Sequence, residues 1–237
     1  LRLLEGVVAR GGVDVAETRG RYLAWHRAKG FDQGPTAARV LDLLAAGRPP
    51  AEAVRKADAE AGGMTAGCNP MHRAAPLAIA LMIPDAALAQ AAIGDAAITH
   101  AHAIAGEAAA AAAMLLRLVV RGVAWEEAAA RAATGRDPQV ASAMARWREA
   151  PRDRGGFAPV VLHAAMHFVG TAASFDRALS AALSFAGPSN YAPVTAGTLA
   201  GARFGARAID AARIAPVHDM AELERMAETL AGKTGSR

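Results

Sequence analysis

Along most of the chain, hydrophobic residues recur at the spacing of one face of an α-helix, with polar residues between them. In residues 15–28, Tyr22 and Trp25 fall on one side of a predicted helix, and in residues 36–44 Val40 and the leucines that follow it point toward a core. Glycine and proline stop both segments. The chain therefore opens with short amphipathic helices separated by tight breaks.

The same periodicity continues to the end of the sequence, and hardly any strand is predicted. Residues 61–73 are predicted as a glycine-bearing loop, and the closing "AGKTGSR" as a frayed tail. Further helices are predicted over residues 51–60, 76–83, 85–91, 98–121, 125–133, 138–149, 160–169, 174–184, 195–209 and 220–230. Short helices of unequal length indicate an all-α fold, a compact orthogonal multi-helix domain rather than a regular bundle. We find no repeat and no linker, so residues 1–237 are expected to form a single domain.

The amino-acid composition indicates how the predicted helices pack. Hydrophobic residues make up 53% of the 237 positions and aromatic residues only 5%, because alanine dominates, which favours closely packed helices. The apolar stretch 103–120 is interrupted by Glu107 and Arg117, which indicates a buried core helix rather than a membrane span. Cys68 is the only cysteine, so no intramolecular disulfide can form. We expect a cytoplasmic protein with no membrane partner.

The charge balance does not identify a partner. The net charge is +4 and the calculated pI about 9.8, which would suit an anionic ligand. The arginines are scattered instead of forming a stripe with aromatic neighbours. We therefore expect no nucleic-acid partner, and most of these charges to be a solvated surface.

Two loops carry candidate chemistry, and each also has a purely structural explanation. The first is "GGMTAGCNPMHRAAP", where a glycine-rich segment before a helix would expose N–H groups to an anion such as phosphate. The second is "AITHAHA", in which Thr99 could cap the following helix. His100 and His102 are two residues apart, a spacing that does not favour a two-histidine metal site.

A third segment, "AGPSNYAPVTAGTLAGARFG", combines a tight turn with glycines at every fourth position. Gly197, Gly201 and Gly205 are interpreted as a packing surface for close helix crossing.

Six blocks in this order resemble the ADP-ribosylglycohydrolases, including the dinitrogenase reductase activating type. The blocks are "RYLAWHR", "DQGPTAAR", "AGCNPMHRAAP", "ITHAHAIA", "SFDRAL" and "AGPSNYAPVTAGTLAGARFG", and together they span nearly the whole chain. The family patterns that they resemble include "AGNGxxMRxAP", "ITHxxP" and "GGDxDTxgaixGaxxGaxyG".

The resemblance implies an all-α protein that binds ADP-ribose in a cleft with two magnesium ions. It further implies hydrolysis of the bond between ADP-ribose and a modified side chain, with ADP-ribose or an ADP-ribosylated protein as partner. Metal-bound water can attack the anomeric carbon in such a reaction. The implied ligand-binding residues are Gly67, Asn69, Arg73, His100, Ser189 and Asn190, with His100 as a neutral imidazole rather than a metal ligand.

The sequence departs from the family at the expected metal site. Pro188, Asn190 and Tyr191 stand where the family has two aspartates and a threonine, and Cys68 replaces an asparagine. The family's other threonine and aspartates would precede Leu1, so the domain is expected to lack that metal-binding segment. Magnesium is expected from the resemblance, but its ligands are largely missing here.

Three functions remain open on these residues. The first is an ADP-ribosyl hydrolase with an incomplete metal site. The second is a degenerate member that binds ADP-ribose or a related nucleotide without hydrolysis, and the third is a helical protein-interaction scaffold. The missing carboxylates favour weak or no hydrolysis by this chain.

Overall fold

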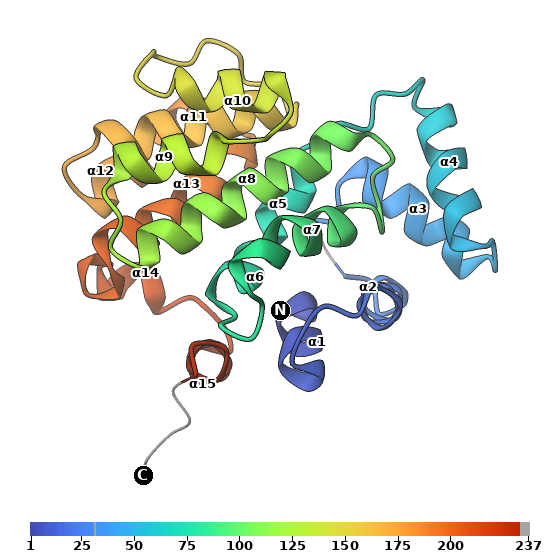
Figure 1. Cartoon of the computed structure of the whole chain (residues 1–237). Coiled ribbons are helices and arrows are strands. Elements are labelled where there is room, and N and C mark those ends of the chain that lie inside the picture. Colours follow the sequence, from blue (N-terminus) through green and yellow to red (C-terminus); the bar gives the residue numbers. More distant parts are fainter. Residues whose placement is uncertain (31, 233–237) are drawn as a thin grey trace.

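The computed structural model describes residues 1–30 and 32–232 as helices joined by short loops, as Figure 1 shows. The first helices are α1 (Arg2–Arg10), α2 (Val15–Arg27), α3 (Pro35–Ala45), α4 (Pro50–Glu60), α5 (Asn69–Arg73), α6 (Ala75–Ile79) and α7 (Asp85–Ala96). They are followed by α8 (Ala103–Val120), α9 (Trp125–Ala133), α10 (Pro138–Ala145), α11 (Ala158–Thr171), α12 (Phe175–Ala186), α13 (Tyr191–Phe204), η1 (Ala206–Ala208), α14 (Ala211–Ile214) and α15 (Met220–Leu230). The predicted all-α fold is confirmed.

Helix α8 lies at the centre of the fold. It packs on α5, α6, α7, α9, α10, α11 and α13, and in Figure 1 it separates the α9–α13 group from α2, α3 and α4. By length and composition it could cross a membrane, but 78% of its residues are buried inside the protein. This burial is typical of a core helix, as its interrupted apolar pattern predicted.

Close helix packing in this core depends on alanine and on one glycine. Ala105, Ala108, Ala109 and Ala111 of α8 are fully buried. An added Cβ at Gly106 would lie 3.4 Å from the Cα of Ile93 in α7. Small side chains therefore let α7 cross α8 at short distance.

Polar side chains begin several helices. The Asp14 carboxylate accepts a hydrogen bond from the Glu17 amide at 2.9 Å, at the start of α2. Ser174 accepts from the Arg177 amide at 3.3 Å, at the start of α12. These side chains satisfy amides that have no partner within the helix.

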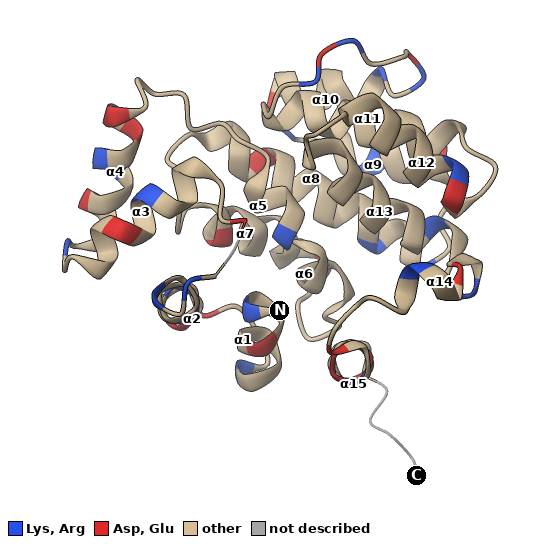
Figure 2. Ribbon diagram, turned by 180° about the vertical axis from the view of Figure 1, so that it is seen from behind, with Lys and Arg blue, Asp and Glu red and all other residues tan. Residues whose placement is uncertain are grey.

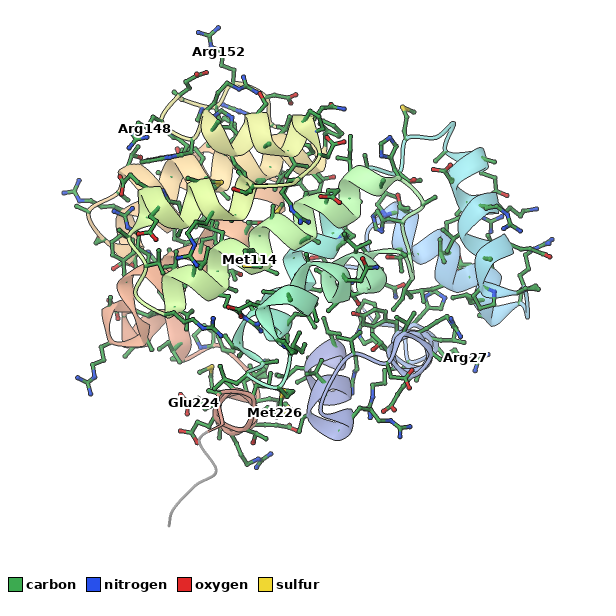
Figure 3. The ribbon with its side chains drawn as sticks, in the orientation of Figure 1. Arg27, Met114, Arg148, Arg152, Glu224 and Met226 are labelled. Atoms are coloured by element: carbon green, nitrogen blue, oxygen red, sulfur yellow. The ribbon has the colours of Figure 1, made fainter. Side chains whose placement is uncertain are left out.

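Charged side chains are spread over many helices. Figure 2 shows Lys and Arg beside Asp and Glu on α3 and α4, whereas α8 and α11 are largely free of either colour. Figure 3 shows Arg148 and Arg152 at the outer edge of the molecule, near the loop after α10. The distribution is that of a solvated surface.

Four sequence predictions of local structure are wrong. Residues 69–73, predicted as loop, form α5, and α8 begins at Ala103 rather than at residue 98. Thr99 does not cap α8, because the Nδ1 of His102 accepts from the Ile104 amide. Helix α13 begins at Tyr191 and ends at Phe204, earlier at both ends than the predicted 195–209. The predicted frayed tail lies outside the described residues from position 233 onward.

The glycine row of α13 does not form the predicted packing surface. An added Cβ at Gly201 would meet nothing within 4 Å, and at Gly197 it would touch only the Leu179 side chain at 3.8 Å. Gly205 ends the helix at a positive φ of 81°, which explains glycine at that position. Only this last glycine has a clear backbone reason.

Candidate ligand-binding site

Two asparagines from distant parts of the sequence contact the same loop. The Asn69 amide nitrogen donates to the Gln33 carbonyl at 3.3 Å, and the Asn190 amide nitrogen donates to the Asp32 carboxylate at 2.7 Å. The loop between α2 and α3 therefore joins the start of α5 to the start of α13. This places Asn69 and Asn190 on one side of the molecule, around one loop.

Gly34 allows this approach. It has a positive φ of 69°, and an added Cβ would lie 2.4 Å from the Asn69 amide nitrogen. A side chain at this position would displace Asn69. Gly34 was not among the predicted site residues, although it lies in the block "DQGPTAAR".

A second bond ties α5 to α13. The Nε2 of His72 lies 2.9 Å from the Tyr191 carbonyl, so this nitrogen carries the proton and donates. Burial lowers the pKa of His72, which favours the neutral ring. His72 was also missed from the sequence, where it stands directly before Arg73.

The Gly67 segment is held by a single antiparallel bridge. The Ala158 amide donates to the Ala66 carbonyl at 2.9 Å, and the Cys68 amide donates to the Gly156 carbonyl at 3.0 Å. This pairing leaves the Gly67 amide and carbonyl pointing away from Phe157. Phe157 also lines a groove of about 320 Å³ between α10 and α11.

Arg73 belongs to a buried polar network rather than to an open surface. Its Nε donates to the Asp95 carboxylate at 2.7 Å, and one terminal nitrogen, Nη2, donates to the Asp95 carbonyl at 2.8 Å. The Tyr22 hydroxyl donates to the other Asp95 oxygen at 2.7 Å. Burial, followed by the Asp95 charge, raises the pKa of Tyr22 well above its usual value. Among the described residues, Nη1 alone of the Arg73 nitrogens has no partner, so only this nitrogen is open to a direct ligand contact.

The network ends at His100, which faces Gly67. Nη2 of Arg73 also donates to the Thr99 hydroxyl at 3.0 Å, and this hydroxyl lies 2.9 Å from Nδ1 of His100. An added Cβ at Gly67 would be 3.5 Å from Nε2 of His100. Burial and the Arg73 charge lower the pKa of His100 to about 3, so the ring is neutral.

Ser189 and Asn190 shape the turn before α13. The Ser189 hydroxyl accepts from the Tyr191 amide at 3.2 Å. Asn190 is the N-cap residue, but its side chain makes no capping bond and turns to Asp32 instead. The structure thus brings Gly67, Asn69, His100 and Asn190 around connected loops, with Ser189 beside them.

The donor set at this turn does not fit two divalent cations. Asn190 presents its amide nitrogen to Asp32, and Pro188 has no ligand atom. Within residues 1–30 and 32–232, no three His, Cys, Asp or Glu side chains are grouped so that they could hold a metal ion. We therefore derive no reaction step through magnesium.

Comparison with known proteins gives a consistent result. A family model described as ADP-ribosylglycohydrolase matches residues 1–237. Among solved structures, 41 chains match. One of them, described as an ADP-ribosylglycohydrolase-related protein complex, is 29% identical, and the match covers 99% of this chain and 79% of that chain with a TM-score of 0.80. A search of curated proteins finds no match.

Proposed function

Because this chain belongs to the ADP-ribosylglycohydrolase family, we propose that it acts as an ADP-ribosyl hydrolase-like protein whose ligand is the ADP-ribosyl group. The ligand would lie over Gly67, Asn69, His100 and Asn190, and its source would be an ADP-ribosylated protein or a related compound. We also propose that the protein works in the cytoplasm, with no membrane or nucleic-acid partner.

The meeting of three segments carries this proposal: the start of α5, the loop before α8 and the turn before α13. The Gly67 backbone turns away from its bridge to Phe157, and the neutral His100 ring lies behind it. Asn69 and Asn190 use their amide nitrogens within the protein. Their side-chain oxygens have no partner among the described residues, and could therefore accept from ribose hydroxyls.

A specific contact favours the second candidate function, ADP-ribose binding without hydrolysis. Asn190 stands at a position where the family resemblance places a metal-binding aspartate. In this structure its amide is hydrogen-bonded to Asp32. Binding should then depend on neutral hydrogen bonds and backbone groups, and little on magnesium.

Calorimetry with ADP-ribose, in magnesium and in chelator, tests the site. We expect measurable binding that differs little between the two conditions. Gly67→Val would place a branched side chain against His100 and should weaken binding roughly tenfold or more, which corresponds to about 1.4 kcal/mol. Gly12→Val is the matched control, since an added Cβ at Gly12 meets nothing within 4 Å.

Three outcomes separate the candidate functions. Release of ADP-ribose from an ADP-ribosylated protein would support the hydrolase, and binding without release would support the second candidate. No binding of ADP-ribose, with or without magnesium, would contradict both of these functions. The helical protein-interaction scaffold would then be the remaining candidate. A strong magnesium requirement would show that the turn at Asn190 has been aligned wrongly with the family.

A further inference from the structure

In the buried network behind Gly67, the donor and the acceptor of each hydrogen bond can be assigned. Arginine has only donors, so the Thr99 hydroxyl oxygen accepts from Nη2 of Arg73. The position of Arg73 is itself fixed by two bonds to Asp95, one to the carboxylate and one to the carbonyl. The Asp95 carboxylate is 1% exposed and also receives the Tyr22 hydroxyl.

The remaining proton of Thr99 has one partner among the described residues. Thr99 is 1% exposed, and its hydroxyl contacts only Arg73 and Nδ1 of His100. If Nδ1 carried the proton and donated to Thr99, the hydroxyl proton would be buried without an acceptor, which costs free energy. The low-cost arrangement has Thr99 donating to an unprotonated Nδ1.

The opposite ring nitrogen then carries the imidazole proton. The pKa of His100, lowered to about 3 by burial and by the Arg73 charge, keeps the ring neutral. A neutral imidazole with an accepting Nδ1 has its proton on Nε2. Nε2 is the atom that faces Gly67, and it has no hydrogen-bond partner within the part of the chain that the structure describes.

We propose that Thr99, held by Arg73 and Asp95, is a positioning residue that fixes the Nε2–H tautomer of His100 and aims this donor at the ligand above Gly67. The contact between this donor and a ligand rests on the proposed function, whereas the tautomer is a property of the free protein. The donor selects a ligand atom that accepts hydrogen bonds, such as a phosphate or ribose oxygen, and disfavours a donor group at the same point.

Nitrogen NMR of the free protein, labelled with ¹⁵N at histidine, tests the tautomer directly. We expect His100 to show an unprotonated Nδ1 and a protonated Nε2 from pH 5 to pH 8. Thr99→Val keeps the shape but removes the hydroxyl, so Nδ1 loses its donor and the spectrum should shift toward a tautomer mixture. Thr99→Ser restores the hydroxyl and should restore the wild-type spectrum. A wild-type His100 protonated at Nδ1 would overturn the proposal without any variant.

Calorimetry then tests whether the Nε2–H group of His100 contacts the ligand. Thr99→Val should weaken ADP-ribose binding about five- to tenfold, as for one lost hydrogen bond, and Thr99→Ser should bind as the wild type does. Thr134→Val is the control, because Thr134 is exposed and bonds only within α9. If Thr99→Val changed the tautomer but not the affinity for ADP-ribose, Nε2 of His100 would not donate to the ligand, which would contradict this part of the proposal. Failure of the wild type to bind ADP-ribose would instead refute the proposed function.

Discussion

Arg117 is a fully buried charge whose partners are mainly backbone carbonyls. Its guanidinium donates to the carbonyls of Leu77, Ala78, Ala80 and Ile83 at 2.6–2.8 Å. It also reaches the Asp85 carboxylate at 3.0 Å. The segment from α6 to α7 is thus fastened to the middle of the fold by one side chain. Buried charges are tolerated when every donor is satisfied in this way.

We expect Arg117→Met to destabilise the protein by about 3–5 kcal/mol, because three buried carbonyls, of Leu77, Ala78 and Ile83, lose their donor. The Ala80 carbonyl keeps the Ile83 amide. Arg121→Met is the matched control. Arg121 bonds to the same Asp85 but is exposed, so its loss should cost less than about 1 kcal/mol. Urea unfolding of both variants measures the difference. Equal losses would contradict the importance of the buried carbonyl contacts.

The neutral His100 makes a testable contribution to pH dependence. Its pKa falls from an ordinary 6.5 to about 3 in the folded protein. Between these values the unfolded chain binds a proton that the folded protein does not. Stability should therefore fall as the pH falls through this range, by up to about 1.4 kcal/mol per pH unit, and level off below pH 3.

Replacing the ring isolates this contribution from that of other acidic groups. The stability of the wild type relative to His100→Asn should decrease between pH 7 and pH 4 in urea unfolding. A stability difference that does not change with pH would show that His100 is protonated without cost in the folded protein.

At the scale of helices, periodicity predicted most elements, and their boundaries less well. Residues 125–133 and 220–230 were predicted with the bounds observed, because both carry clear amphipathic patterns. The five residues of α5 are too few to show a period. Glycine spacing in α13 indicated close packing, but no neighbouring helix approaches Gly201. Spacing alone cannot show which face of a helix has a neighbour.

The candidate site was predictable only in part. The order of the motifs indicated Gly67, Asn69, His100 and Asn190, and their role in ligand binding remains a prediction. Asp32 bonds to Asn190 across 158 positions of sequence, and no local pattern reveals such a contact. Asp95 was missed for the same reason, since it lies within an alanine-rich helix and meets Arg73 only in the fold.

The same substitution at two helical glycines should stabilise the protein to different degrees. Gly201→Ala adds a methyl in open space within α13 and should stabilise the protein by about 0.5–1 kcal/mol. Gly106→Ala gains the same backbone term, but its methyl lies 3.4 Å from the Cα of Ile93 in α7, so it should stabilise the protein less. Thermal unfolding of the two variants measures the difference. A larger gain at Gly106 than at Gly201 would contradict a close approach of α7 to α8.

At the scale of the whole molecule, burial decreases from α8 toward the last helices. Helix α14 has no buried residue, and α15 has only Met226 and Leu230 buried. Figure 3 shows Met226 and Glu224 on different sides of α15, as expected for a helix with a single inner face. The final helices thus add little to the central packing, although α15 contacts α1 and α6.

Amide hydrogen exchange should follow this order. We expect the slowest exchange in the middle of α8, where opening requires much of the core to unfold, and the fastest in α14 and α15. Exchange monitored by mass spectrometry on peptides from each helix measures the difference. Protection of α15 equal to that of α8 would indicate that the whole chain opens as one unit.

The alanine-filled surface of α8 changes which substitutions count as conservative. Larger apolar residues are usually tolerated inside proteins when the volume can be accommodated. At Ala105, Ala108, Ala109 and Ala111, each fully buried, a larger side chain would have to displace its neighbours. In a library of random variants, valine or leucine at these positions should be lost more often than at the exposed end of the same helix. For this helix, size limits sequence drift in addition to polarity.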